Sequence, residues 1–449
     1  MELREEILKN KEVLFDVLKT LVSYNSVENK NEEGTPFGVE VKKCLDKALE
    51  YGKSFGCKTK NLDNYCGYAE IGNGEETIGI ACHLDVVPAG NGWDTDPFTL
   101  TEKDGYFYGR GVSDDKGAAS ASLIALKLIN DLKLDLNGKK VRLIFGCNEE
   151  TGSLCMKHYN EIEGPFDYGF TPDSEFPCVN GEKGHIKGTF RCSDTTLIDI
   201  KGGVAFNALC DKCTIKLPEN AYDTSVLDEY LKENGLNIER TIDNDIETLT
   251  VIGKSAHASM PELGLNAITY AMYGLKQSGF DDPFVNEYCN FFDLESAGKA
   301  LGIDCEDEYG YLTMVNGVIE KNNDEISGTI DIRVPVTLKT TSIVDKIKQK
   351  ETIFTVIVDS YENALFYPED SHLVKSLMTA YKKVNKEENA KPSISGGGTY
   401  AKSLKNCVAF GCEFPNNENN IHDANEKVKI EELFLQVELY INAILELVK

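Results

Sequence analysis

The sequence predicts an α/β domain with a mostly parallel central sheet flanked by helices, and a second, α+β domain inserted into it. Three observations support this. Up to about residue 182, short apolar runs typical of buried strands alternate with helical patterns. Beyond that point, the sequence changes to strand-like runs and short helices that are typical of an α+β domain. The first pattern then resumes at about residue 391. We therefore expect residues 1–182 and 391–449 to form one domain and residues 183–390 the insertion.

Length and charge limit the possible functions. A chain of 449 residues can form two domains, each with a hydrophobic core. The excess of 74 acidic over 47 basic residues gives a formal charge of −27, which disfavours binding to nucleic acid or to anionic membranes. The residues after Met1 include several acids, whereas the start of a signal peptide is basic. No apolar stretch approaches the roughly eighteen residues of a membrane-spanning helix. We therefore expect a cytoplasmic protein. The fourteen cysteines, including the lone Cys210-x-x-Cys213 pair, are expected to be reduced.

The first chemically informative element is a buried strand at residues 77–82. Two amphipathic helices, at residues 2–24 and 37–55, and a strand at 65–71 precede it. The strand ends in His83-Leu84-Asp85, and in an extended segment His83 and Asp85 point the same way. This arrangement suits a metal-binding imidazole that a neighbouring carboxylate orients. The alternative is a half-buried histidine beside a solvated acid.

A glycine-rich turn then presents two adjacent aspartates. A hairpin at residues 98–108 leads into Gly109 to Gly117, and a helix of small residues follows at 118–132. Asp114 or Asp115 could cap this helix. The functional alternative is that one of them bridges two metal ions.

Two further strands end in acidic residues. The buried run at 141–146 leads directly to Glu149-Glu150, and the strand at 167–170 leads to Asp173. Because the carboxyl ends of parallel strands meet at the edge where open α/β sheets bind ligands, these acids and His83 are expected to converge. A loop with solvated acids is the simpler reading of Glu149-Glu150 alone.

The later part of the chain supplies the remaining candidates. The insertion contains strand candidates at 246–253, 311–318 and 325–335 and a helix at 267–276. The returning segment contains a glycine-rich turn at 395–400, a buried run at 407–411 and a terminal amphipathic helix at 430–448. His422 lies between the last two elements.

The strand ends and the C-terminal loop together offer two nitrogen and three carboxylate ligands: His83, Asp114, Glu150, Asp173 and His422. Zinc accepts such a mixture, and a shared carboxylate can hold two ions about 3.5–4 Å apart. Glu149 would then be available as a general base that takes a proton from a water activated by the metals.

The same residues carry a resemblance to a known family. The motifs are His83-Leu84-Asp85-Val86-Val87-Pro88, Gly109-Arg110-Gly111 through Asp114-Asp115-Lys116-Gly117, Asn148-Glu149-Glu150, Thr171-Pro172-Asp173-Ser174-Glu175 and His422-Asp423-Ala424-Asn425-Glu426. Their combination resembles the dinuclear zinc peptidases that include aminoacylases, carnosinases and PepV-type dipeptidases, along essentially the whole chain. The resemblance implies two zinc ions, with manganese or cobalt as possible replacements. His83 and Asp173 would hold one ion, and Glu150 and His422 the other. Asp114 would be the bridge, followed by a cis peptide, with Asp115 as the fallback. Asp85 would orient His83, and Glu149 would be the base.

The inserted domain also resembles the lid of this family. His257, in the Gly253 to Pro261 segment, matches a histidine that stabilises the oxyanion. Arg333 matches an arginine that binds the terminal carboxylate of the substrate, for which a guanidinium fork is suited. The same carboxylate would receive donors from Gly397, Gly398 and Thr399, and Asn207 would line the lid. Lys402 departs from the pattern, because an arginine is expected there.

We therefore expect a cytoplasmic metallopeptidase that hydrolyses dipeptides with free amino and carboxyl ends, with no nucleic-acid or membrane partner. The long insertion implies two pseudo-related halves that replace a partner subunit, and hence a monomer. An amidohydrolase that deacylates N-acyl amino acids with the same metals is the alternative. A third possibility is a protein with this fold that binds a ligand without catalysing a reaction.

Overall fold

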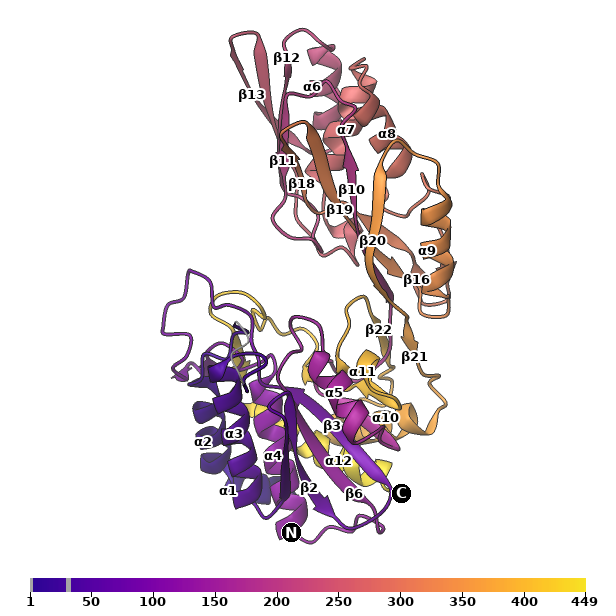
Figure 1. The fold of residues 1–449 in the computed structure, drawn as a ribbon. Coiled ribbons are helices and arrows are strands. Elements are labelled where there is room, and N and C mark those ends of the chain that lie inside the picture. Colours follow the sequence, from indigo (N-terminus) through magenta and orange to yellow (C-terminus); the bar gives the residue numbers. More distant parts are fainter. Residues whose placement is uncertain (1–2, 30–33) are drawn as a thin grey trace. The chain divides into compact units, whose positions relative to one another are not determined.

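The computed structural model describes residues 3–29 and 34–449, so residue 2, the first of the expected N-terminal helix, lies outside the described part. The chain divides into two compact units (Figure 1). The first unit consists of Met1–Gly181, Tyr367–Ile394 and Gly398–Lys449, and the second of Glu182–Phe366 and Ser395–Gly397.

The chain returns to the first unit earlier than the expected position of about residue 391. The reason is helix α10 (His372–Asn385), which packs against the terminal helix α12 (Ile430–Leu447). Leu373, Val374 and Leu377 of α10 are buried, so this helix contributes to the core of the first unit.

The central sheet of the first unit has parallel strands in its middle and antiparallel strands at its margins. Its strands follow the order β1-β2-β6-β3-β7-β23-β9. They are β1 (Lys58–Leu62), β2 (Cys66–Gly72), β3 (Thr77–His83), β6 (Lys140–Gly146), β7 (Tyr168–Thr171), β9 (Val179–Glu182) and β23 (Cys407–Ala409). Strand β3 runs parallel to β6 and β7, and β7 runs parallel to β23. These contacts agree with the predicted mostly parallel sheet.

Helices and short strands complete the first unit. Its other helices are α1 (Leu3–Lys9), α2 (Lys11–Val22), α3 (Val39–Ser54), α4 (Lys116–Asp131), α5 (Leu154–Ile162) and α11 (Tyr400–Ser403). A small sheet joins β4 (Thr101–Lys103), β5 (Tyr106–Tyr108) and β25 (Lys427–Lys429), and β8 (Ser174–Glu175) pairs with β24 (Cys412–Glu413). Helix α4 packs against α2, α12 and strand β3, and its apolar side chains are buried.

The second unit is an antiparallel sheet with helices, in agreement with the predicted α+β domain. Its strands follow the order β13-β14-β12-β11-β18-β19-β10-β20, and β17 also pairs with β19. They are β10 (Gly184–Cys192), β11 (Asp199–Gly202), β12 (Lys212–Pro218), β13 (Asn237–Asp243), β14 (Ile246–Ile252), β17 (Thr313–Val315), β18 (Ile319–Asn322), β19 (Glu325–Val334) and β20 (Thr355–Glu362). That this unit consists of two pseudo-related halves stays a prediction.

The helices of the second unit are α6 (Thr224–Glu233), α7 (Ala267–Gln277), α8 (Pro283–Phe291) and α9 (Thr340–Gln349). Short elements are η1 (Pro261–Leu263), β15 (Glu306–Asp307) and β16 (Gly310–Tyr311), and β21 (Leu365–Phe366) and β22 (Ser393–Ser395) lie where the chain passes from one unit to the other. Aromatic rings fill the core, where Phe190 stacks on Phe354 with centroids 4.9 Å apart.

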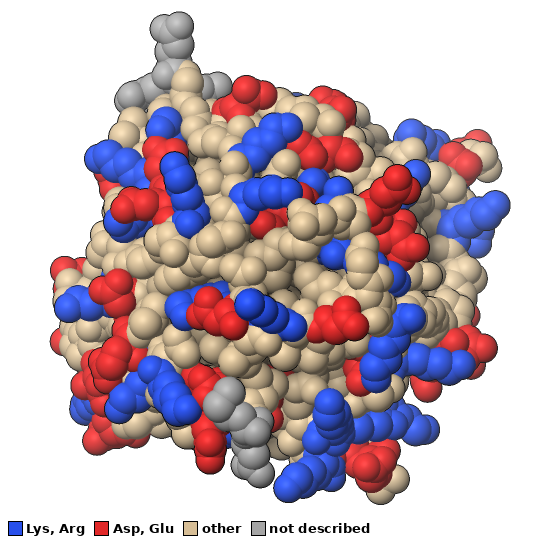
Figure 2. All heavy atoms as spheres, turned by 90° about the horizontal axis from the view of Figure 1, so that it is seen from below, with Lys and Arg blue, Asp and Glu red and all other residues tan. Residues whose placement is uncertain are grey.

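Positive and negative side chains are interspersed on the face shown in Figure 2. The described part of this face therefore carries no large area of a single sign of charge. Among the described residues, no helix combines the length and apolar character needed to cross a bilayer.

Candidate metal centre

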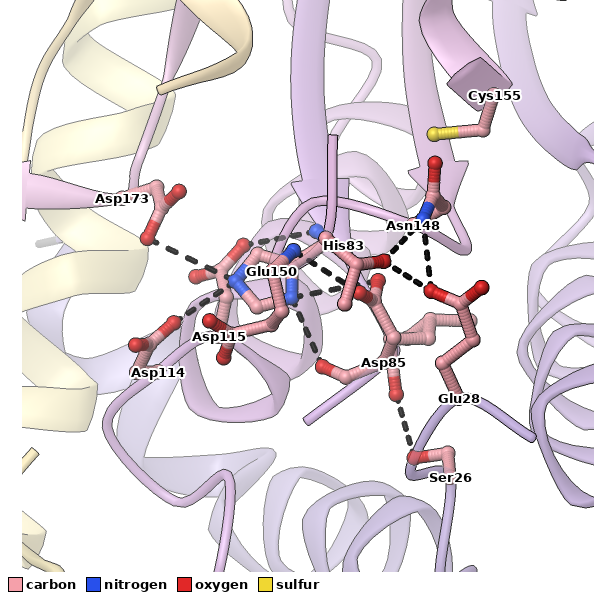
Figure 3. A network of polar contacts seen from close by, with 12 residues as sticks. Ser26, Glu28, His83, Asp85, Asp114, Asp115, Asn148, Glu150, Cys155 and Asp173 are labelled. Carbon is pink, nitrogen blue, oxygen red and sulfur yellow. Dashed lines mark hydrogen bonds and ion pairs between the residues drawn. The ribbon is translucent and has the colours of Figure 1, made fainter. Parts of the chain in front are cut away.

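The carboxyl ends of three parallel strands bring His83, Glu150 and Asp173 together, and Figure 3 shows these residues beside Asp114. In the sheet register, His83 at the end of β3 lies opposite Gly146 at the end of β6. Strand β7 ends at Thr171, two residues before Asp173. The convergence therefore follows from the parallel arrangement itself.

His83 is held so that one ring nitrogen faces the acids. Its Nδ1 lies 2.9 Å from the backbone oxygen of Asp85, which is an acceptor and therefore assigns the proton to Nδ1. Nε2 lies 2.8 Å from Oδ1 of Asp114 and 3.7 Å from Oδ1 of Asp173. The ring is 1% exposed. Nε2 is thus the nitrogen available to a cation.

His422 approaches the same aspartate from the other side. Its Nε2 lies 2.9 Å from Oδ2 of Asp114 and 3.3 Å from Oε2 of Glu150. The backbone at His422 has φ of 65°, in the left-handed region that few non-glycine residues adopt. Each carboxylate oxygen of Asp114 therefore faces a different histidine, as a bridging ligand requires.

Asp115 has a different role from its neighbour. The cis peptide expected from the resemblance joins Asp114 to Asp115. Asp115 is fully buried, and its Oδ2 accepts a hydrogen bond from the backbone N–H of His83 at 3.0 Å. Although it occupies the N-cap position of α4, its side chain makes no capping hydrogen bond. The capping interpretation of this residue was therefore wrong.

Asp85 lies behind His83. Its Oδ2 accepts a hydrogen bond from the backbone N–H of Glu150 at 3.1 Å, and its Oδ1 lies 3.6 Å from Nδ1 of His83. The side chain is 1% exposed. This position suits the predicted orienting role.

The paired glutamates lie beside different neighbours. Ligand atoms of His83, Glu149 and Asp173 lie within 4.8 Å of one another, and so do those of His83, Asp114 and Glu150. Oε1 of Glu150 is buried and has no hydrogen-bond partner. Burial and the negative charge of Asp173 raise the pKa of the Glu149 carboxyl well above its usual range.

The electrostatics of the centre fit divalent cations. Burial raises the pKa of Asp173 to about 7, against the pull of His83. The hydrogen bonds with Asp114 and Glu150 raise the pKa of His422 far above its ordinary value. The acids outnumber the histidines, and one buried acceptor of Glu150 has no partner. Two divalent ions would supply the missing positive charge to a donor set of oxygen and imidazole nitrogen that zinc accepts.

The second unit carries the predicted His257, on a loop next to Asn207. The backbone N–H of Ala258 donates to the oxygen of Asn207 at 2.9 Å. Nδ1 of His257 accepts a hydrogen bond from the N–H of Ser259 at 3.3 Å and lies 2.7 Å from its hydroxyl. Burial and Arg333 lower the pKa of His257. The imidazole is therefore neutral at pH 7, with its proton on Nε2, where it can be donated.

Arg333 is fixed by its own strand and by the glycine-rich turn. Its Nε and Nη2 donate to the two carboxylate oxygens of Asp331, and its Nη1 donates to the oxygen of Gly396 at 2.8 Å. Nε2 of His185 lies 3.0 Å from Oδ2 of Asp331. Arg333 is 4% exposed. The guanidinium is therefore oriented, with part of its donor set already used.

The predicted carboxylate donors in the turn are partly occupied. The N–H of Gly397 donates to the hydroxyl of Ser395 at 3.0 Å, so this amide serves the turn itself. Oγ1 of Thr399 accepts from the N–H of Ala401 at 3.1 Å and caps α11. Nζ of Lys402 lies beside Gly398, 3.1 Å from the position that a Cβ on this glycine would occupy. The Lys402 charge is thus placed beside the predicted loop.

Four residues that contact or lie near the candidate site residues were given no role from the sequence: Ser259, Asp331, Glu413 and Glu426. Asp331 and Ser259 stand two residues from Arg333 and His257, a spacing that signals a shared face on a strand for the first pair. Glu413 pairs with Glu175 across β24 and β8. Glu426 belongs to the His422 motif, but its burial is apparent only in the structure.

Comparison with known proteins places the chain in a family. The sequence model of peptidase family M20/M25/M40 matches residues 79–446. "Putative dipeptidase YtjP" of Bacillus subtilis is 36% identical over 464 residues, covering 99% of both chains. A "Putative dipeptidase" of Staphylococcus epidermidis is 31% identical, covering 98% of both.

Solved structures share the fold. Human carnosine dipeptidase 1 is 17% identical, with a TM-score of 0.60 over 99% of this chain and 98% of that one. The di-peptidase Dug1p of Saccharomyces cerevisiae is 16% identical, with a TM-score of 0.58 over 99% and 98%. Since the family match spans most of the chain and agrees with the site geometry, this protein belongs to the metallopeptidases of family M20/M25/M40.

Proposed function

We propose that this protein hydrolyses dipeptides with free amino and carboxyl ends. The observation that carries the proposal is the position of Asp114, whose two carboxylate oxygens face His83 and His422 while Glu149 lies beside His83 and Asp173. This arrangement combines a shared metal ligand with an adjacent general base.

The metal ligands would be divided between two ions. His83 and Asp173 would hold one ion, Glu150 and His422 the other, and Asp114 both. When bound, two zinc ions, or manganese or cobalt in their place, supply positive charge that lowers the pKa of water and polarises a carbonyl. Glu149 takes the proton from the attacking water and passes it to the leaving nitrogen.

The second unit would bind and polarise the substrate. The N–H at Nε2 of His257 is proposed to stabilise the developing oxyanion, for which a neutral donor with a fixed tautomer is suited. Arg333 is proposed to bind the terminal carboxylate through the N–H groups that Asp331 and Gly396 do not occupy. Gly398 and Thr399 add donors, and Asn207 lies beside the His257 loop.

The acidic environment favours a free amino group over an acyl group at the other end of the substrate. Burial, Asp114 and Glu175 raise the pKa of Glu413 to about 7, so negative charge has accumulated beside the ligands. An ammonium group would stabilise this charge, whereas the acyl group of an N-acyl amino acid would not. We therefore propose that Glu413 contributes to binding the amino group of the substrate.

A substrate panel tests this proposal. Ala-Xaa dipeptides and the matching N-acetyl amino acids are assayed with zinc or manganese added, and we expect cleavage of the dipeptides. Exclusive cleavage of the acetylated set would support the deacylase alternative.

A Glu149→Ala variant tests whether the protein is a catalyst. It is expected to retain both metals and lose turnover, whereas Glu161→Ala, which removes an acid near the end of α5, should match the wild type. Full activity of Glu149→Ala would contradict the mechanism. We further propose that the enzyme is cytoplasmic and monomeric. A tight dimer in light scattering would contradict the proposed monomer.

A further inference from the structure

Glu426 gathers an unusual number of donors from the turn that carries Asp114. Its Oε2 accepts from Nη1 of Arg110 at 2.8 Å and from the N–H of Gly111 at 2.9 Å. Its Oε1 accepts from the N–H of Ser113 at 2.8 Å and of Asp114 at 3.1 Å. The side chain is fully buried. A single carboxylate therefore binds the Arg110 side chain and three backbone N–H groups of the turn, those of Gly111, Ser113 and Asp114.

The backbone of Glu426 strengthens the same connection. Its oxygen accepts from the N–H of Gly109 at 3.1 Å. The next residue, Lys427, begins β25, which pairs with β5 immediately before the turn, with Lys427 opposite Tyr108. Main-chain and side-chain contacts thus hold the turn against the loop of His422, which lies four residues before Glu426.

Arg110 extends this connection to the segment that follows His83. Its side chain is 1% exposed, and its Nη2 lies 3.4 Å from the oxygen of Pro88. The guanidinium lies 5.3 Å from the ring centre of Trp93. The buried charge of Glu426 is therefore paired, and the pair contacts all three segments that carry His83, Asp114 and His422.

We propose that Glu426 is a positioning residue that sets the Asp114 carboxylate between His83 and His422 and thereby determines the affinity for the metal pair. Within residues 3–29 and 34–449, no other side chain binds as many backbone amides of this turn as Glu426 does. An aspartate that bridges two ions must be placed correctly with respect to both. Loss of one acceptor oxygen would free the N–H groups at Ser113 and Asp114 and let the bridge move. This inference rests on the dinuclear centre proposed above.

The decisive variant is Glu426→Gln, which keeps the size of the side chain but places an NH2 group against N–H donors. Metal affinity is measured without substrate, by competition of cobalt or zinc with a chromophoric chelator and by the visible spectrum of bound cobalt. Because residues that orient metal ligands typically contribute about 10–100-fold to affinity, we expect a loss of that order. The cobalt spectrum should change, and excess metal should restore most of the turnover.

Glu70→Gln is the matched control. Glu70 pairs with Arg142 in the same unit through a hydrogen bond of 2.8 Å, remote from the ligands. This variant should lower the melting temperature and leave metal affinity unchanged. Wild-type affinity and an unchanged cobalt spectrum in folded Glu426→Gln would overturn the inference.

Glu426→Asp covers the case in which the glutamine variant does not fold. It retains the charge that Arg110 requires but is one methylene shorter, so it cannot reach both ends of the turn. We expect a folded protein with at least about fivefold weaker metal binding, and unchanged binding would overturn the inference. A wild-type protein that binds no metal pair would instead contradict the proposed centre, so the two failures are distinguishable.

Discussion

Asp331 holds Arg333 with both of its carboxylate oxygens, at 2.7 Å from Nε to Oδ1 and 3.0 Å from Nη2 to Oδ2. The arginine is buried, so its orientation depends on this pair and on Gly396. A guanidinium that is fixed before the substrate arrives loses less entropy when it binds a carboxylate.

Asp331→Asn is therefore expected to raise KM for dipeptides by ~10-fold, with a smaller effect on kcat. The matched control is Asp228→Asn, because both oxygens of Asp228 likewise accept from one arginine, Arg240, at 3.0 and 2.7 Å on the surface of the same unit. Steady-state kinetics on one dipeptide decide the outcome. Equal KM values for wild type and Asp331→Asn would contradict the role of Arg333.

Removal of the His257 imidazole should mainly reduce kcat. A positioned oxyanion donor is commonly worth about 10²–10³ in rate, and we expect a loss of that order for His257→Ala with little change in KM. Ser259→Ala should cause a smaller loss, because the N–H of Ser259 still binds Nδ1. His158→Ala removes a histidine that pairs with Asp63 near the surface and serves as the control. A normal kcat for His257→Ala would exclude the proposed donor.

Glu413→Gln is expected to weaken the preference for a free amino group. The variant removes a negative charge beside Asp114 and Asp173, so KM for Ala-Xaa should rise severalfold while any residual cleavage of N-acetyl substrates is unchanged or increased. The ratio of kcat/KM for the two substrate classes is the measurement. An unchanged ratio would show that the amino group is bound elsewhere.

The metal-free protein should lose stability as the pH rises. Burial raises the pKa of Asp173 and of Glu413 to about 7 in the folded state, so both bind protons there that the unfolded chain has lost above about pH 4. Hydrogen bonds with Asp114 and Glu150 raise the pKa of His422, so its stabilising contribution is complete below about pH 6.5 and is lost at higher pH. All three pKa values are raised in the folded state, so each group contributes less to stability as the pH rises.

We therefore expect the Tm of the metal-free protein to fall between about pH 5 and pH 8, whereas the zinc-loaded protein should change much less because the ions replace these protons. Asp114 does not alter this window, since its lowered pKa, caused by His422 and His83 despite burial, acts only below about pH 4. Calorimetry of both forms is the test. A constant or rising Tm without metal would contradict the electrostatic account.

The predicted ligands meet because their positions follow from a simple rule. His83, Glu150 and Asp173 each follow a buried run, and parallel strands end at one edge of a sheet. The apolar runs themselves identified the strands, since β3 and β6 are buried on both faces and read as continuous apolar segments.

Other features depend on contacts that no local pattern contains. The different surroundings of Asp114 and Asp115 depend on the folded turn. Asp114 faces the histidines, whereas Asp115 accepts a hydrogen bond from the N–H of His83. The return of the chain at Tyr367 depends on the packing of α10 against α12, which are separated by a long stretch of sequence. Glu426 stands within a recognised motif, yet its role appears only when its four donors are seen.

The most direct test of the central claim is metal reconstitution followed by hydrolysis of an Ala-Xaa dipeptide. Metal-free protein is titrated with zinc or manganese while bound metal per chain and turnover are measured together. The account predicts that turnover approaches its maximum as two ions bind per chain. Full turnover by the metal-free protein, or saturation of metal binding without dipeptide hydrolysis, would contradict it.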